Sequence, residues 1–561
     1  MSCRLLARRS FNEGGWVVSC WIVKVGIIDN FRLDSLSVAY LLTNIKHGVI
    51  INNRCAVKIL SKIKSMPNSS IGIQERQRRP DRILSTRDVI LLFMINALLS
   101  LLIYSPILNA FFTFDDISVI SITNPMQGKT WIDCFRIMSN GFWRPLTLGS
   151  GRLMLCLSGY NPFGFHLITI FLHVICSVLT ALMGARLGLP RKICFMASFL
   201  LSSHFGAFPA VSQLQNICDV WLAAALLFGL LCFDRWIRSD GNASGIFIAC
   251  LFAFAAKESG AIFPLVIALW ALRYRPIPPR FWRLLVLLCV LSGMYGLMSL
   301  GRQLTSDFSY MSEGRLIFSP KSFMRQMADY GFSSFFPFIH IVQFPFRPIL
   351  LPHAVLWLIR AGVIGTAFIV FSRLFLKKER TGIGILLAVI SIVFCYPALM
   401  QGHPEGRFLY PALPFAVLAI CQVWHHSKGA KSLLFKLVIS IIWIIFLMSF
   451  FLSQSVYDYK RTADRVEACV IEMKRLAPGW ASHSQIAIYN HPHPGSPPWR
   501  WSYCQQLFNI FIPEAHATVA LDTITSDTAY VYRFEKNRLI EVRTPEQIKP
   551  AKTGKIIPQL E

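Results

Sequence analysis

Charged residues are scarce in this sequence, and acidic residues are the scarcest of them. Only 15% of the 561 residues are charged, and Asp and Glu together number 29, whereas a soluble domain is about a quarter charged. A soluble protein of this length would also need several separate hydrophobic cores. Here the apolar residues, 54% of the total, form blocks of roughly 17–25, about the length of a helix that crosses a membrane. The composition excludes a soluble globular enzyme and a disordered chain, and it predicts a polytopic membrane protein.

Other features that the sequence lacks narrow the choice further. No nucleic-acid-binding module accompanies the net charge of +27, and the basic residues lie between apolar blocks, as they do in the cytoplasmic loops of membrane proteins. We therefore expect no nucleic-acid partner. No small-residue cleavage site follows a clean apolar run, so we expect no secretory signal peptide. No internal repeat is visible either, and in particular no 34-residue helical repeat. Most of the 15 cysteines lie inside apolar blocks, which excludes a disulfide scaffold.

The chain divides into three predicted regions. Residues 1–87 hold fifteen basic and five acidic residues without a sustained helical or strand period, so we expect a poorly ordered basic cytoplasmic tail. Residues 88–453 predict an all-α transmembrane domain of about eleven helices, with long outer loops at 108–164 and 301–353. Residues 454–561 predict a small α+β domain outside the cytoplasm.

The individual elements follow from the apolar blocks and from residue periodicity. In the last region, helical periodicity covers Asp458–Leu476, and strand-like alternation covers Gln485–Tyr489 and Thr528–Phe534. When the spans alternate in direction, the basic short loops fall on one side, which places the N-terminus in the cytoplasm and the C-terminus outside. The predicted membrane segments are Val89–Ile107, Phe165–Leu187, Ile193–Val211, Leu214–Phe233, Gly245–Leu272, Phe281–Leu300, Ala354–Leu376, Gly382–Met400, Leu409–Trp424 and Leu433–Leu452.

The segment Gly245–Leu272 is unusual because polar residues interrupt its centre. Lys257, Glu258, Ser259 and Gly260 divide it into halves of about twelve residues, each roughly 18 Å long and too short to cross a membrane alone. A polar turn at that depth is tolerated only where it lines a wet cavity. The pattern predicts two half-length helices that meet at a polar turn.

Two adjacent carboxylates follow the first predicted span directly. Asp115 and Asp116 lie where carboxylates are costly unless they face water, a cation or a partner. One of two neighbouring acids can accept a proton while the other orients it or holds a metal. The alternative is structural, because Asp is also a good N-cap for a short helix that would begin at Ile117.

Several short motifs occur in order along the apolar region. They are Phe112-Thr-Phe-Asp-Asp-Ile117, Trp143-Arg-Pro-Leu146, Gly159-Tyr-Asn-Pro-Phe-Gly-Phe-His166, Ser203-His204, Asn216-Ile-Cys-Asp219, Ala256-Lys-Glu-Ser-Gly260 and Glu405-Gly-Arg-Phe-Leu-Tyr-Pro411. With these motifs, the region 88–425 resembles the GT-C class of integral-membrane glycosyltransferases, and within it the branch of transmembrane protein O-mannosyltransferases and their bacterial relatives. Gly406 is a departure from that pattern, since relatives often join the glutamate of the last motif directly to its arginine.

This resemblance implies transfer of a mannose-like hexose from a polyprenyl-phosphate donor to a hydroxyl of a protein or glycan acceptor, on the outer membrane face. It implies that Asp115 is the catalytic base and that Asp116 assists it or holds a divalent metal ion. Basic groups would bind the donor phosphate, with Arg144, Lys257 and Arg407 as the candidates. Since the repeat array of the animal members is missing, a bacterial inner membrane is expected rather than an endoplasmic reticulum membrane. The expected cavity-lining residues are His204, Asp219, Glu258, His403 and Glu405.

Each basic candidate has a structural alternative. Arg144 would serve as an interfacial anchor, Lys257 would pair with Glu258 or another buried acid, and Arg407 would cap a helix or meet lipid headgroups. The whole chain has an alternative as well: a transporter or flippase of a lipid-linked substrate would use similar helices and intramembrane charges. Transporters usually contain inverted repeats, and none is visible in this sequence.

Overall fold

A computed structural model describes part of the chain. Residues 1–83 of the predicted tail, the span Ala354–Leu376, and the candidate residues Asp115, His403 and Glu405 lie outside the described residues. Most of the predicted outer loop 301–353 and most of the predicted spans Gly382–Met400 and Leu433–Leu452 also lie outside them. The last two residues of the predicted tail, Thr86 and Arg87, belong to the first helix of the described chain. The described residues are 84–113, 116–125, 128–136, 142–239, 242–274, 276–305, 386–387, 389–390, 406–426, 433, 436–437, 440–441, 443–444, 447, 454–479, 485–489, 509–512, 518–521, 528–535 and 538–541.

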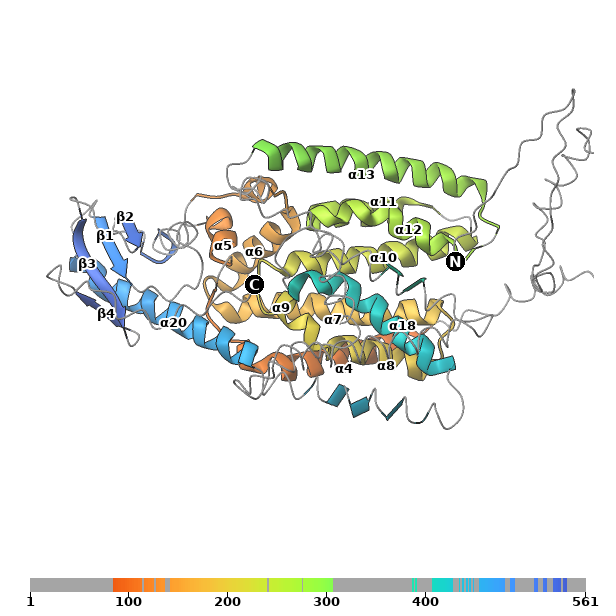
Figure 1. Ribbon diagram of the computed structural model, residues 1–561, viewed down its shortest axis with the longest axis horizontal. Helices are drawn as coiled ribbons and strands as arrows, with labels where there is room; N and C mark the ends of the chain where they lie inside the picture. Colours follow the sequence, from red (N-terminus) through yellow and green to blue (C-terminus); the bar gives the residue numbers. More distant parts are fainter. Residues whose placement is uncertain are drawn as a thin grey trace, which may run out of the picture. The chain divides into compact units, whose positions relative to one another are not determined.

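The described part of the chain is mostly helical, with one small sheet (Figure 1). The α-helices are α4 (Thr86–Tyr104), α5 (Asp116–Thr123), α6 (Pro145–Ser158), α7 (Pro162–Arg186), α8 (Arg191–Ser202), α9 (Phe208–Val211), α10 (Ile217–Ser239), α11 (Ser244–Ala256), α12 (Phe263–Ala271), α13 (Pro279–Thr305), α18 (Leu413–His426) and α20 (Gln454–Leu476). The 3₁₀ segments are η2 (Ser105–Ile107), η4 (Trp131–Phe135), η5 (Phe205–Ala207), η6 (Glu258–Ile262), η7 (Gly406–Ala412) and η8 (Ala477–Gly479). The strands are β1 (Gln485–Tyr489), β2 (Thr518–Leu521), β3 (Thr528–Glu535) and β4 (Arg538–Glu541).

Five stretches of the described chain are long and apolar enough to cross a membrane, and a sixth is a pair of helices bent by 49°. The chain is therefore a multi-pass membrane protein, as its composition predicts. The bend lies in the predicted span Ile193–Val211, between Ser202 and Phe205, so that span is not one straight helix. The total of about eleven helices stays a prediction. The five stretches are Thr86–Ile107, Pro162–Arg186, Ile217–Ser239, Pro279–Arg302 and Arg407–His426.

Local sequence signals explain where these helices begin and end. Helix α7 starts after Asn161, whose side chain accepts a hydrogen bond from the Phe163 amide, and Pro162 occupies the first helical position. Gly188, with φ of 78°, follows its last residues in the left-handed conformation that glycine adopts readily. Helix α4 begins with a capping box between Ser85 and Asp88.

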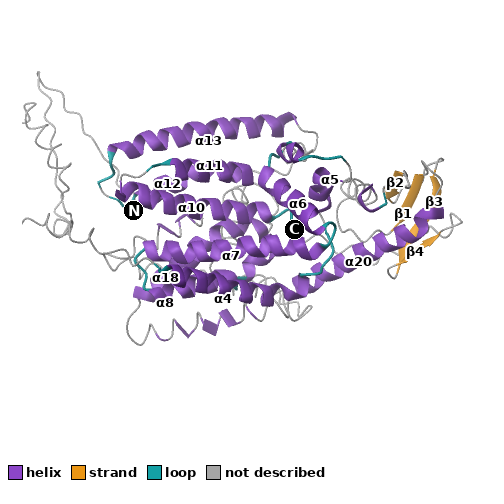
Figure 2. Cartoon of the chain, turned by 180° about the vertical axis from the view of Figure 1, so that it is seen from behind, coloured by secondary structure: helices purple, strands orange, loops and turns teal. Residues whose placement is uncertain are grey.

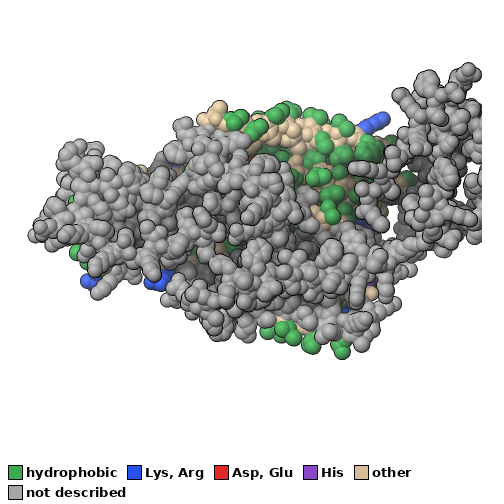
Figure 3. Space-filling view, viewed as in Figure 1, with side chains coloured by type: hydrophobic (Ala, Val, Ile, Leu, Met, Phe, Trp, Pro, Cys, Tyr) green, Lys and Arg blue, Asp and Glu red, His purple; other side chains and the backbone are tan. Residues whose placement is uncertain are grey.

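Helix α10 is central, whereas α13 lies at the periphery (Figures 1 and 2). In the most apolar 18-residue stretch of α10, 78% of the residues are buried inside the protein, whereas 22% are buried in the corresponding stretch of α13. Figure 3 shows hydrophobic side chains gathered on the surface where α13 lies. Among the exposed residues of α13, Val286, Met294 and Leu297 are 61–72% exposed. Such a surface is suited to contact with lipid.

The predicted pair of half-length helices is confirmed. Helix α11 ends at Ala256, Lys257 has extended backbone with φ of −161° and ψ of 154°, and α12 begins at Phe263. The two half-length helices run in opposite directions beside α10. Lys257, between them, contacts Asp219 near the start of α10, and Tyr274, after α12, contacts Asp234 near the end of α10. We call these two places the Asp219 end and the Asp234 end.

Close approach explains why the turn contains glycine. A Cβ atom on Gly260 would overlap the backbone carbonyl oxygen of Ala253 in α11. The backbone there cannot move without disturbing the helix, so the position excludes larger residues.

A four-stranded sheet follows α20 in the last region. Its strand order is β2-β1-β3-β4, with β1 parallel to both β2 and β3, and with β4 antiparallel to β3. The residues Asp458–Leu476, predicted to be helical, lie within α20, and the predicted strands coincide with β1 and β3. Buried side chains of α20 include Val466, Cys469 and Met473, spaced at helical intervals on one face.

Candidate active site

Asp116 is a buried carboxylate at the start of α5. Its side chain is 2% exposed. Oδ2 accepts a hydrogen bond from the Thr113 amide at 3.3 Å, and Oδ1 accepts one from the Gln215 amide at 3.1 Å. The helix begins at Asp116 rather than at Ile117. The carboxylate thus joins the first outer loop to residues 213–219, which we call the 213–219 segment.

Lys257 reaches the 213–219 segment from the break between α11 and α12. Its Nζ lies 2.6 Å from Oδ1 of Asp219, and the two side chains are 7% and 1% exposed. The same ammonium lies 4.2 Å from the ring centroid of Phe408, a cation–π distance. Cys218 contacts the other oxygen of Asp219, with 3.7 Å between Sγ and Oδ2. Lys257 is therefore paired with a buried acid, and that acid is not its neighbour Glu258.

Glu258 pairs instead with Arg144, which immediately precedes α6. Arg144 Nε donates to Oε1 at 3.1 Å, and Nη2 donates to Oε2 at 2.9 Å, so the contact is bidentate. The Arg144 guanidinium also lies 4.2 Å from the ring centroid of Phe142. The Arg144 side chain is 7% exposed, whereas that of Glu258 is 20% exposed. Of the two ion pairs, this is the more accessible one.

Arg407, in the 3₁₀ segment η7, also contacts the 213–219 segment. Its Nη1 donates to Oδ1 of Asn216 at 2.5 Å. The Asn216 amide is itself oriented by two acceptors, because its Nδ2 donates to the Pro209 carbonyl at 2.8 Å and to Oε1 of Gln213 at 2.6 Å. The resemblance placed Arg407 in the site, and the structure gives it a fixed polar partner.

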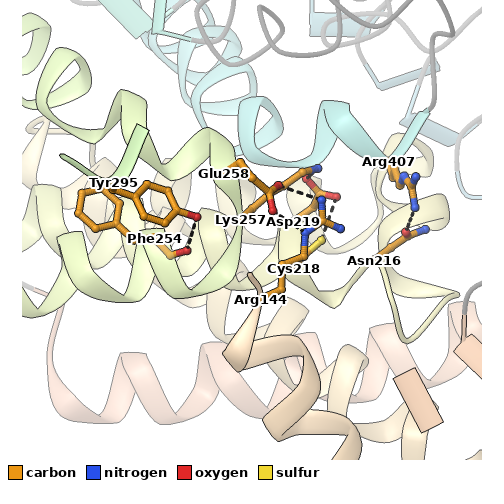
Figure 4. A network of polar contacts seen from close by, with 9 residues as sticks. All are labelled: Arg144, Asn216, Cys218, Asp219, Phe254, Lys257, Glu258, Tyr295 and Arg407. Carbon is orange, nitrogen blue, oxygen red and sulfur yellow. Dashed lines mark hydrogen bonds and ion pairs between the residues drawn. The ribbon is translucent and has the colours of Figure 1, made fainter. Parts of the chain in front are cut away.

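The structure brings six of the ten predicted site residues into one connected arrangement. Figure 4 shows the two ion pairs side by side, with the Arg407–Asn216 contact next to them. Asp116 joins through the Gln215 amide, within the same short segment. These residues come from distant parts of the sequence, from Asp116 to Arg407, so the fold brings them together. They are Asp116, Arg144, Asp219, Lys257, Glu258 and Arg407.

His204 has a different environment. It is fully buried, its Nδ1 accepts a hydrogen bond from the Gly206 amide at 3.0 Å, and its ring lies 5.6 Å from that of Trp443. These contacts cap the short η5 turn beside the bend after α8. Its role as a cavity-lining residue stays a prediction, as do the roles of Asp115, His403 and Glu405, which lie outside the described residues.

Asn216, Phe408 and Tyr459 were not among the predicted site residues. Asn216 and Phe408 lie inside the quoted motifs, so their neighbours Asp219 and Arg407 were the available signal. Tyr459 lies in α20, outside the resemblance, and donates from its hydroxyl to the Ser212 carbonyl at 2.7 Å. No motif signalled that contact.

The described residues contain no group of three or more His, Cys, Asp or Glu side chains that could hold a metal ion. Both oxygens of Asp116 accept backbone amides, and the other member of the predicted pair, Asp115, is outside the described residues. A divalent ion at these two aspartates stays a prediction, and no step below depends on it.

Comparison with known sequences supports the resemblance. The chain is 29% identical over 163 residues to the protein O-mannosyl-transferase TMTC2 of Mus musculus, a match that covers 26% of this chain and 19% of that protein. It is 28% identical over 174 residues to the protein O-mannosyl-transferase Tmtc1 of Drosophila melanogaster, with 29% and 20% covered. The resemblance to protein O-mannosyltransferases is confirmed. The chain spans about a fifth of the length of these curated relatives, and no family model matches it.

Two solved structures are similar over a larger part of the chain, at low identity. The archaeal oligosaccharyltransferase AglB from Archaeoglobus fulgidus, in complex with an inhibitory peptide and a dolichol-phosphate, has a TM-score of 0.41 and 12% identity, and the match covers 77% of this chain and 64% of that one. ArnT from Cupriavidus metallidurans bound to undecaprenyl phosphate has a TM-score of 0.42 and 14% identity, with 78% and 90% covered.

Proposed function

We propose that this protein is a GT-C-type glycosyltransferase that moves a mannose-like hexose from a polyprenyl-phosphate donor to a hydroxyl acceptor at the outer face of a membrane. The observation that carries the proposal is the connected arrangement around the 213–219 segment. It combines cationic side chains suited to a phosphate with a carboxylate next to the proposed base, in a multi-pass membrane protein. The sequence similarity to protein O-mannosyltransferases supports the same reaction.

The reaction needs two kinds of group. The acceptor oxygen forms a bond to the anomeric carbon, and the bond from that carbon to the phosphate oxygen breaks. The acceptor proton goes to the carboxylate of Asp115, and polyprenyl phosphate leaves with the bonding electron pair. A base near the anomeric carbon and cations near the leaving phosphate each lower the barrier.

The two ion pairs give the cations different roles toward the donor phosphate. Asp219 holds Lys257 in a pair that is almost fully buried, so the lysine is fixed in position. Arg144 lies in the more open pair, and its planar guanidinium can contact two phosphate oxygens at once. We therefore assign the donor phosphate to Arg144 and Arg407, with the Lys257 charge behind them. When the donor binds, its phosphate replaces Glu258 as the partner of Arg144.

Substitution of Arg144 tests this assignment. Arg144→Lys keeps the charge and loses the bidentate geometry, so we expect kcat/KM for the donor to fall about 10- to 100-fold, the equivalent of a hydrogen bond to a charged group. The measurement is release of polyprenyl phosphate by the purified full chain, supplied with a panel of polyprenyl-phosphate sugars and hydroxyl acceptors. Arg136→Lys is the matched control, because Arg136 lies in the same outer loop and is 67% exposed.

Two results would contradict the proposal. Equal activity of Arg144→Lys and Arg136→Lys would remove Arg144 from the donor site. Movement of a lipid-linked sugar across vesicle membranes without release of polyprenyl phosphate would favour a transporter or flippase instead.

A further inference from the structure

The last region of the chain contacts the residues around Asp116 at two separate places, one beside the 213–219 segment and one in the first outer loop. The first contact is made by Tyr459 of α20, which is 7% exposed. Its hydroxyl donates to the Ser212 carbonyl at 2.7 Å, and its ring packs edge-on against Phe208 with 6.2 Å between centroids. Burial, followed by the nearby charge of Asp116, raises the pKa of Tyr459 well above its ordinary value. Tyr459 therefore stays a neutral hydrogen-bond donor beside the Asp116 carboxylate.

The second contact is made by Phe511. Its ring lies 5.4 Å from that of Phe111 and 5.3 Å from that of Tyr160. The Tyr160 hydroxyl donates to Oδ1 of Asn124 at 2.8 Å. Lys474, near the end of α20, places its ammonium 5.4 Å from the Phe511 ring centroid and so connects Phe511 to the same helix.

These contacts bracket the segment that carries the proposed base. Phe111 lies just before Asp115 and Asp116, and Asn124 follows the end of α5. Tyr459 reaches Asp116, which lies between Phe111 and Asn124, indirectly. It holds the carbonyl of Ser212, three residues before the Gln215 amide that binds Asp116. The described residues on either side of the proposed base, 111–113 and 116–124, are thus linked at Phe111, Asp116 and Asn124 to groups connected to α20.

We propose that α20 and Phe511 form a brace that positions the Asp115–Asp116 carboxylates for transfer, with Tyr459 and Phe511 as positioning residues. The inference rests on the proposed function, and it gives residues 454–561 a task that the resemblance does not supply. Neither side chain touches the reacting atoms. Loss of either contact should therefore change how often the base is correctly placed, which affects kcat, and should leave donor binding almost unchanged.

The test compares Tyr459→Phe and Phe511→Ala with a control on the same helix. Tyr459→Phe keeps the ring against Phe208 and removes one neutral hydrogen bond, so we expect kcat to fall about 3- to 10-fold and KM for the donor to stay within about twofold. Phe511→Ala should lower kcat further, and Phe511→Leu, which keeps apolar volume, should recover part of the loss. Ile471→Ala is the control, since Ile471 lies on α20 and is 58% exposed.

Hydrogen exchange separates failure of the brace from failure of the proposed function. Peptides that cover residues 111–124 should exchange faster in Tyr459→Phe than in the parent protein, whether or not any sugar transfer is detected. Unchanged exchange and unchanged kcat in folded Tyr459→Phe and Phe511→Ala would overturn the brace. A rise in donor KM at constant kcat would overturn it too, because the region would then bind the donor rather than position the base.

Discussion

Helix α10 carries two buried aspartates, about 22 Å apart along its axis, and their surroundings differ. At the Asp219 end, three cationic side chains have separate partners: Lys257 has Asp219, Arg144 has Glu258, and Arg407 has Asn216. One of these partners, Glu258, is 20% exposed. At this end each cation is held in place by its own polar group.

At the Asp234 end, several arginines converge on one fully buried carboxylate. The distances from Asp234 oxygens are 3.3 Å to Arg238, 3.6 Å to Arg273 and 3.9 Å to Arg186, and the Tyr274 hydroxyl also donates to it. These residues come from α7, α10 and the turn after α12. At the Asp234 end, three arginines share one acid and connect α7, α10 and the turn after α12, whereas at the Asp219 end each cation has its own polar partner.

Exchange of carboxylate for amide at the proposed base and at Asp234 should give opposite results. Asp115→Asn removes the proposed base beside Asp116, so we expect kcat to fall by about 10²–10⁴ with near-normal folded yield. Asp234→Asn removes the buried anion shared by three arginines that are 12–34% exposed, and it should destabilise the protein by about 1–3 kcal/mol, with near-normal turnover per folded molecule. Thermal unfolding in detergent and transfer kinetics would be measured for both. Normal turnover of Asp115→Asn, or a stable but inactive Asp234→Asn, would contradict the roles assigned to the proposed base and to Asp234.

A double-mutant cycle sharpens the comparison at the Asp219 end. Lys257→Met leaves the Asp219 carboxylate buried without its ammonium, so the variant should lose stability. Adding Asp219→Asn should return about 1–3 kcal/mol, the usual coupling between residues in contact. Sugar transfer should not return with the stability, because the positive charge is still missing. Full recovery of transfer in the double variant would show that the pair is purely structural.

A surface pair on α20 provides the smallest expected effect. The Glu472 carboxylate accepts from Arg475 at 2.9 Å and from the Leu539 amide of β4 at 3.3 Å, and chiefly the Arg475 hydrogen bond lowers its pKa. Because the folded state favours the charged form, this stabilisation is present above the ordinary pKa of 4.5 and is lost as the pH falls through the lowered value. We expect it to be at most about 1 kcal/mol.

Hydrogen exchange at the Leu539 amide measures that effect. The difference in protection between the parent and Glu472→Gln should be visible near neutral pH and should vanish in acid. A difference that persists at a pH well below the pKa of Glu472 would mean that the contact with β4 does not depend on the carboxylate charge.

Much of the fold could be predicted because the apolar blocks are long and their interruptions are polar. The break at Lys257 was visible, since four polar residues divide an otherwise apolar segment of 28 residues. The 49° bend between Ser202 and Phe205 lies at a shorter polar interruption, Ser202-Ser203-His204, which the predicted span Ile193–Val211 runs through. Helix α10 runs to Ser239, beyond the predicted end at Phe233, because the charge of Asp234 is compensated inside the protein.

The membership of the site was easier to predict than its pairing. Motif order identified Arg144, Lys257 and Arg407, but their partners depend on backbone direction and on tertiary contacts. Adjacent residues in extended backbone point to opposite sides, so Lys257 and Glu258 cannot both serve one partner. The contact of Arg407 with Asn216 joins residues 191 positions apart, and periodicity carries no information over that distance.

The Lys257–Glu258 dipeptide also limits how this protein can change over evolutionary time. Each residue of the dipeptide holds a partner from a different part of the fold, Asp219 in α10 and Arg144 just before α6, and Gly260 fixes the backbone that points them apart. Insertion or deletion of one residue at this turn would send both charges to the wrong sides at once. Single substitutions would leave a buried partner alone. Viable descendants must therefore keep the number of residues in this turn and replace both members of an ion pair together. The turn should accept fewer insertions and deletions than the outer loops of the chain.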